Sequence, residues 1–236
     1  MECNVYLGGP SQFELQGAIL VYTGGHAAAG AFAAWHDIES DKTCAPRLGP
    51  AKPLSTFFLK ELSRGLGAMM RPEILPENVL VRTPDMLVWW RPAQRRKMFF
   101  RHDDELGVVS GRVFPQPALI YRASHRELWI RALADDVRPT ATTALNVAPY
   151  YNVNTEGVVC QGTMRSPAEA CVATMAQWEQ SFFESEFTHL YGSGHFTQHS
   201  GGVAGLWSSL AGKKAFPVDQ LAAAGETLAQ FVERER

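Results

Sequence analysis

The sequence predicts an α+β protein in which an antiparallel meander is flanked by helices, preceded by a β-hairpin and followed by a C-terminal helix. Three observations support this class. Short runs of alternating apolar residues recur at the period of half-buried strands. Short polar connections join them, which favours antiparallel pairing. Apolar residues recur at helical spacing near residues 54–62, 171–182 and 218–232.

Length and composition are sufficient for a complete hydrophobic core. The chain has 236 residues, of which 46% are hydrophobic and 19% charged. A formal net charge of -2 excludes a globally basic nucleic-acid binder, so we expect a protein partner and no nucleic acid. No apolar run approaches the roughly 20 residues that cross a bilayer, and the N-terminus lacks the basic start of a signal peptide. We expect a cytoplasmic protein without membrane association.

The chain has four widely spaced cysteines, and no two of them form a C-x-x-C pair. This spacing indicates neither a disulfide framework nor a cysteine zinc site. No G-x-G-x-x-G follows a strand and opens a helix, so a nucleotide site is not expected either. We therefore predict no cofactor and no metal. The four residues are Cys3, Cys44, Cys160 and Cys171.

The N-terminal part is predicted to be a β-hairpin. Apolar residues alternate over residues 13–21, and a second strand is expected over about 30–38. Residues 40–53 carry three prolines and other turn formers, which predicts a connecting loop. We assign residues 1–52 to a hairpin extension and linker.

A helix is expected to begin at Pro53 and to lie on a sheet. Residues 54–62 have apolar side chains at helical spacing, and Gly65 is placed to end the run. We assign residues 53–200 to one core domain. The strands of this domain are expected at 79–81, 86–90, 97–101, 118–122 and 127–133.

A basic cluster lies between two of these strands. It fits either a solvated hairpin tip or a surface that docks an acidic partner or a phosphate backbone. Its members are Arg91, Arg95, Arg96, Lys97 and Arg101.

Residues 149–160 form the stretch around which the chain is organised. A strand-like approach ends at Asn152, and a polar turn closed by Gly157 reverses the chain. Two β-branched residues then lead to the thiol of Cys160. This arrangement places a thiol nucleophile close to a side-chain amide that can donate to an oxyanion.

A helix start is predicted directly after this stretch. Residues 166–169 read Ser-Pro-Ala-Glu, which is the pattern of a capping box with proline at the first helical position. Cys171 falls on the apolar face of this helix and is interpreted as a small core residue. The other members of that face are Met175, Trp178 and Phe182.

The C-terminal third begins with a polar, glycine-rich loop over residues 187–202 that contains His189, His195 and His199. Such a loop can bring an imidazole to a site on another element. Residues 201–236 are assigned to a C-terminal helical segment, with a final helix from about residue 218.

The string at residues 152–160 resembles the active-site signature of the ubiquitin-conjugating enzyme superfamily, H-P-N-[IV]-x-x-x-G-x-[IV]-C. Family members often carry Trp-Ser-Pro before the next helix, and Arg-Ser-Pro stands at 165–167. The Phe-Pro-Gln-Pro at 114–117 is similar to the proline-rich strand region of that fold. Tyr150-Tyr151 replaces the His-Pro of the signature. The whole chain, with its Phe-Thr-His ending at residue 189, resembles prokaryotic ubiquitin-conjugating family D, the protein B component of the PRTRC cassette.

The resemblance implies a ubiquitin-conjugating-enzyme-like fold and a thioester on Cys160. Asn152 would donate to the oxyanion or hold the loop in place, and His189 would be the base for the amine step, with His195 or His199 in reserve. It also implies three partners: a ubiquitin-like protein, a ThiF-type activating enzyme and a JAB-type isopeptidase.

Two other functions fit the same residues. One is a catalytically inactive module that keeps the conjugating fold to bind a ubiquitin-like or cassette partner, with Tyr150-Tyr151 and the basic cluster as its contact surface. The other is a zinc site built from the three histidines of the glycine-rich loop and Cys160, whose spacing is permissive.

Overall fold

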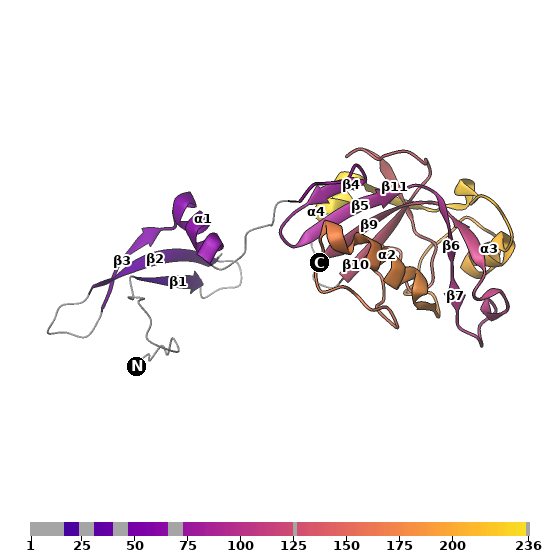
Figure 1. The fold of residues 1–236 in the computed structure, drawn as a ribbon, viewed down its shortest axis with the longest axis horizontal. Coiled ribbons are helices and arrows are strands. Elements are labelled where there is room, and N and C mark those ends of the chain that lie inside the picture. Colours follow the sequence, from indigo (N-terminus) through magenta and orange to yellow (C-terminus); the bar gives the residue numbers. More distant parts are fainter. Residues whose placement is uncertain (1–16, 24–30, 40–46, 66–72, 125–126, 235–236) are drawn as a thin grey trace. The chain divides into compact units, whose positions relative to one another are not determined.

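The structure, a computed structural model, consists of two compact units, residues 1–70 and 71–236, and each is described by itself (Figure 1). The predicted α+β class is confirmed. Cys3 and Cys44 lie outside the described residues. The described residues are 17–23, 31–39, 47–65, 73–124 and 127–234.

The first unit contains a three-stranded antiparallel sheet in the order β1-β2-β3. Strands β1 (Gly17–Thr23) and β2 (Ala31–Glu39) pair along their length, which confirms the predicted hairpin. The predicted loop over 40–53 is wrong for its second half, because β3 (Arg47–Pro53) pairs with β2. Prolines are tolerated there because β3 is an edge strand.

Helix α1 (Thr56–Gly65) also belongs to the first unit, so the predicted core boundary at residue 53 lies too early. The Phe58 ring packs against the Trp35 ring of β2 with centroids 4.7 Å apart. The predicted helix is confirmed, but it begins at Thr56, and the sheet it packs against is that of the first unit, not that of the predicted core domain.

The second unit is built on a six-stranded antiparallel sheet in the order β13-β11-β10-β9-β5-β4. Four of its strands are those predicted at 79–81, 86–90, 118–122 and 127–133, whereas the predicted strand at 97–101 is not part of it and two further strands, β11 and β13, are added. The strands are β4 (Val79–Arg82), β5 (Met86–Arg91), β9 (Ala118–Ser124), β10 (Glu127–Leu133), β11 (Ala144–Val147) and β13 (Ala223–Thr227).

A separate ribbon leaves the sheet between β5 and β9. Strand β6 (Gln94–Lys97) pairs with β8 (Val113–Gln116), not with β5, so the predicted hairpin of 86–90 with 97–101 is wrong. Two further short strands, β7 (Phe99–Phe100) and β12 (Glu186–Phe187), pair in parallel.

Part of the basic cluster is not a solvated hairpin tip, because Arg91 and Arg96 bind a buried carboxylate. Glu179, which is 2% exposed, accepts from Arg91 Nε at 2.6 Å and from Arg96 Nη2 at 2.9 Å. The same carboxylate accepts from the indole of Trp89 at 2.9 Å. Two members of the cluster thus join the sheet and its ribbon to α2 (Met175–Glu184), while Arg95 is exposed.

The sheet is buried on both faces, which explains the near-continuous apolar strands. Alternate residues of β9, such as Tyr121 and Ile120, belong to two different core clusters. Helices α2 (Met175–Glu184) and α3 (Gly202–Leu210) pack in the first cluster, and α4 (Leu228–Glu233) packs in the second. No helix within the described residues is long and apolar enough to span a membrane.

Helix α2 begins eight residues later than predicted, at Met175 and not at Pro167. Residues 166–171 are not helical; a 3-10 turn (Val172–Thr174) comes first. Thr174 supplies the reason. Its one hydroxyl proton is within hydrogen-bond reach of the Glu169 and Cys171 carbonyls, and its oxygen accepts from the Cys171 N–H, which holds Cys171 extended. Cys171 is half-buried and outside both core clusters, so its interpretation as a core residue is wrong.

The predicted final helix is also corrected. A 3-10 turn (Val218–Gln220) and β13 occupy its first half, and only α4 is helical. Thr227, the last residue of β13, caps α4 and so marks the boundary between the two halves. Residues 201–236 are therefore not a separate helical segment, because β13 completes the main sheet.

Candidate active site

The cysteine lies at the end of a tight hairpin over residues 152–160. Asn154 forms the predicted Asx turn, because its side-chain oxygen accepts from the Glu156 N–H at 3.1 Å. The same oxygen accepts from the Val158 N–H at 2.8 Å, and the Asn154 backbone carbonyl accepts from the Gly157 N–H at 2.9 Å. The hairpin closes where the Cys160 N–H donates to the Asn152 carbonyl at 2.7 Å. Asn152 and Cys160 are therefore direct backbone partners, and Cys160 is a partly exposed residue.

The second arm of this hairpin docks on β10. The Val159 N–H donates to the Leu128 carbonyl at 2.9 Å, and the Gly157 carbonyl accepts from the Ile130 N–H at 2.8 Å. Strand β11 pairs with the other end of β10, so the hairpin occupies the edge that β11 leaves open. Gly157 is required, since its φ is +92° and a Cβ would lie 2.8 Å from the Ile130 carbonyl oxygen.

Asn152 joins the hairpin to the segment that follows α2. It is 5% exposed and has φ +62°, a left-handed conformation that asparagine tolerates. Its Nδ2 donates to the Glu186 carbonyl at 2.7 Å, and its Oδ1 accepts from the Thr188 N–H at 3.2 Å and from the Thr188 hydroxyl at 2.9 Å. These partners orient the amide toward residues 186–188, which is the geometry of a residue that holds the loop.

His189 is connected to the same asparagine. Its carbonyl accepts from the Asn152 N–H at 2.9 Å, and its Nδ1 lies 2.9 Å from the Thr188 hydroxyl. Because Thr188 gives its single hydroxyl proton to Asn152 Oδ1, it can only accept from His189. Neutral His189 is thereby held with its proton on Nδ1, which leaves Nε2 unprotonated on an exposed side chain. The sequence alone did not single out Thr188 for this role.

The other two histidines have different surroundings. His195 Nε2 lies 3.1 Å from Gln198 Oε1, and His199 Nδ1 accepts from the Gly201 N–H at 3.1 Å, at the start of α3. No three His, Cys, Asp or Glu side chains within the described ranges are grouped to hold a metal ion. The structure therefore does not bring these histidines and Cys160 together as the zinc site would require.

Tyr150 and Tyr151, which replace the His-Pro of the signature, are core residues. Tyr150 is fully buried and donates to Gln116 Oε1 at 2.7 Å, and its ring contacts Phe182 of α2. Burial, with Asp104 and Glu105 nearby, raises the pKa of Tyr151 to about 12. Neither tyrosine is available as contact surface, so that part of the inactive-module interpretation is wrong.

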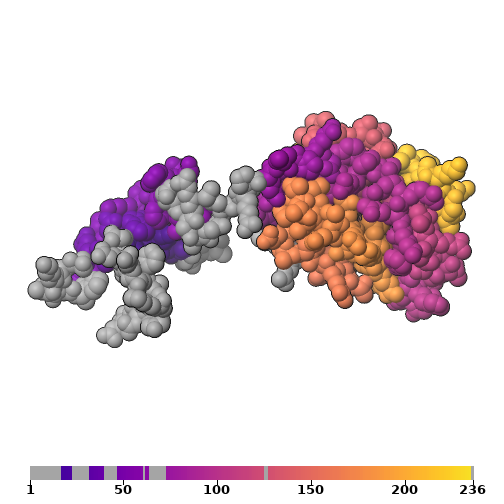
Figure 2. All heavy atoms as spheres, in the orientation of Figure 1, coloured from indigo at the N-terminus to yellow at the C-terminus, as the bar shows by residue number. Residues whose placement is uncertain are grey.

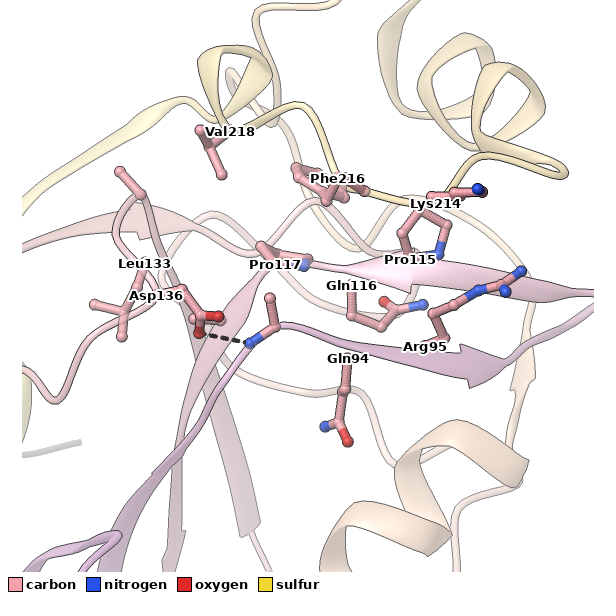
Figure 3. Close-up of a pocket in the computed structure, with 14 residues that line it drawn as sticks. Gln94, Arg95, Pro115, Gln116, Pro117, Leu133, Asp136, Lys214, Phe216 and Val218 are labelled. Carbon is pink, nitrogen blue, oxygen red and sulfur yellow. Dashed lines mark hydrogen bonds between the residues drawn. The ribbon is translucent and has the colours of Figure 1, made fainter.

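The described residues of the second unit line several surface hollows. One of about 220 Å³ lies between the β6–β8 ribbon and Phe216, where Asp136 accepts from the Ala93 N–H at 2.7 Å (Figure 3). None of its lining residues belongs to the cysteine hairpin. A second lies between Phe99 and α2, on the face where magenta and orange atoms meet (Figure 2). The third, of about 260 Å³, is lined in part by Thr163, three residues after Cys160.

The antiparallel sheet, the helices on its faces and the cysteine hairpin define an α+β protein of the ubiquitin-conjugating-enzyme-like class. The model of a family described as prokaryotic E2 family D matches residues 58–224. This match covers more than half of the chain, and the protein belongs to that family. No curated protein and no solved structure gives a significant match. The family supports a conjugating-like role.

Proposed function

We propose that the protein accepts a bacterial ubiquitin-like protein as a thioester on Cys160 and passes it to an amine. The position of Cys160 carries this proposal. This partly exposed residue ends a hairpin that is fixed to β10 on one side and, through Asn152, to residues 186–189 on the other. A nucleophile held in this way meets a large carbonyl substrate without reorganising its own backbone.

Loading is an exchange between two thioesters. The Cys160 thiolate attacks the carbonyl carbon that joins the modifier to its activating enzyme, a new C–S bond forms, and the old C–S bond breaks to release the enzyme's thiolate. The two sulfurs are similar leaving groups, so this step needs no dedicated base. In discharge, an amine nitrogen attacks the same carbonyl carbon, the C–N bond forms, and Cys160 leaves as a thiolate.

The amine must lose a proton during discharge, and His189 is the proposed acceptor through Nε2. Thr188 holds the tautomer that this role requires. Asn152 has the proposed role of holding the hairpin against the segment that carries His189, since its amide is engaged there. Its second Nδ2 hydrogen is the only one left for an oxyanion.

The proposed partners are a ubiquitin-like protein, a ThiF-type activating enzyme and a JAB-type isopeptidase, with the chain acting in the cytoplasm as the protein B component of a PRTRC system. Incubation of the purified full chain with the activating enzyme, the modifier and ATP should yield an adduct that a thiol reductant removes. Binding of the modifier without any adduct would instead establish the inactive conjugating-fold module.

Replacing His189 with alanine should slow discharge of the preloaded thioester to free lysine by about 100-fold near pH 7. The defect should shrink as the pH approaches about 9.5, because more of the lysine amine is then free without help from a base. Single-turnover discharge across this range is the measurement.

Two comparison variants distinguish the loss of a base from other causes of slow discharge. Asn152→Gly keeps the left-handed backbone accessible but removes bonds that do not titrate, so its discharge should stay slow at every pH. His195→Ala changes an exposed histidine of the same loop and should discharge normally. A pH-dependent defect in His195→Ala, with none in His189→Ala, would transfer the role of base to His195.

A further inference from the structure

The tip of the cysteine hairpin is held by a buried ionic cluster that the chemistry above does not use. Arg131, in the middle of β10, is 1% exposed and ion-pairs with Glu226 of β13, at 2.7 Å from Nε and 2.5 Å from Nη2. Its third nitrogen, Nη1, donates to the Thr155 carbonyl at 2.7 Å. One guanidinium group therefore joins the edge strand of the sheet to the tip of the hairpin.

Arg234 makes a second connection of the same kind. From just after α4, its Nη2 donates to the other oxygen of Glu226 at 2.6 Å, and its Nη1 donates to the Glu156 carbonyl at 3.2 Å. Each oxygen of Glu226 is thus bound by a different arginine. Each arginine also binds one of the two consecutive carbonyl groups at the tip, those of Thr155 and Glu156.

The planar fork of arginine explains why this residue type occurs at both positions. Burial lowers the pKa of Arg131 while Glu226 opposes that change, and an arginine keeps its charge in either case. Arg131 uses divergent N–H groups for a carboxylate and a carbonyl. The single ammonium of a lysine does not reproduce that geometry.

We propose that Arg131 and Arg234 are positioning residues for the reaction of Cys160, which hold the hairpin tip and couple it to docking of the C-terminal segment. Gly157, directly after the tip, lies with its α-carbon against Arg131, where an added Cβ would be 3.4 Å from the guanidinium carbon. The catalytic part of this inference rests on the function proposed above.

Arg122 provides a matched control. It binds the same end of α4, with Nη1 donating to the Phe231 carbonyl at 3.0 Å and Nη2 to the Arg234 carbonyl at 2.7 Å. No hydrogen bond joins Arg122 to the hairpin within the described part of the chain. Arg122→Ala therefore weakens the attachment of α4 and removes the stacking of Arg122 on Trp129, but it breaks no described hydrogen bond to the hairpin. Arg234→Ala keeps the carbonyl that Arg122 binds and removes the link to the hairpin.

Amide hydrogen exchange of the full chain, followed by NMR, tests the structural part without any partner protein. In Arg234→Ala, the amides of Val158, Val159 and Cys160 should exchange about tenfold faster, while those of β9 keep their wild-type rates. Arg131→Lys should show the same pattern. Equal acceleration of these three amides in Arg122→Ala, or none in Arg234→Ala, would overturn the inference.

Single-turnover discharge tests the catalytic part. Arg234→Ala should discharge preloaded thioester about tenfold more slowly at every pH, because no titrating group is lost, while Arg122→Ala should keep the wild-type rate. Faster exchange with unchanged discharge would overturn the catalytic part. A wild-type protein that forms no thioester would refute the proposed function, and the exchange experiment would still decide whether the arginines hold the hairpin.

Discussion

Alanine in place of Cys160 is expected to abolish the reducible adduct with the ubiquitin-like protein completely. The proposed thioester has no other sulfur at this hairpin, and hairpin geometry survives because the Cys160 N–H, which closes it, belongs to the backbone. Cys160→Ser should give either no adduct or an oxyester that resists thiol reductants, since an alcohol is a much weaker nucleophile than a thiolate. A non-reducing gel after incubation with activating enzyme, modifier and ATP measures both.

Cys171→Ala is the matched control for this experiment. Cys171 is the other described cysteine and is also half-buried, but its sulfur lies 3.6 Å from Thr174 Oγ1 in the turn before α2. Loading should be intact in this variant. An adduct that persists in Cys160→Ala and disappears in Cys171→Ala would show that Cys171, and not Cys160, is the nucleophile.

Replacing Glu179 with alanine is expected to destabilise the second unit by about 3 kcal/mol. The change leaves Arg91 of β5 and Arg96 of β6 without their shared carboxylate. It also leaves the fully buried indole of Trp89 without its acceptor. Thermal unfolding should show the loss as a fall in Tm of about 6–12 °C.

Asp103→Ala is the comparison variant, because it removes an ion pair that is exposed and not buried. Asp103 and Arg101 are both exposed, with Arg101 Nε 2.5 Å from Asp103 Oδ1, so the loss should be below about 1 kcal/mol. Equal changes in Tm for the two variants would mean that Glu179 does not anchor α2 to the sheet.

The sequence predicts the hairpin better than it predicts the helices around it. Asn154 and Gly157 act within three residues of one another, so turn chemistry is readable from the local sequence. The Ser-Pro-Ala-Glu pattern at 166–169 is equally local but is overruled, because Thr174 binds the backbone ahead of α2 and delays the helix. Likewise, apolar spacing from residue 218 fits a helix, yet pairing with β11 makes half of it a strand.

Buried charges were the least predictable part of the molecule. Arg91 and Arg96 stand in a cluster that resembles a solvated turn, and their partner lies more than 80 residues away. Arg131 is the single charge within the apolar run 128–133, a signal that marks a buried partner without identifying it. Tyr150 and Tyr151 likewise stand next to the signature, and only packing with α2 and Phe100 shows that they belong to the core.

The sequence by itself determined the α+β class, the meander, the family resemblance and a hairpin that ends at Cys160, because strand alternation and turn chemistry depend on neighbours in the chain. Tertiary structure alone decided which groups meet that hairpin: residues 186–189 at Asn152, and Arg131 and Arg234 at its tip. These contacts join residues 24 to 78 positions apart along the chain. Their partners are selected by burial and by the need to satisfy every buried polar group, which no local pattern records.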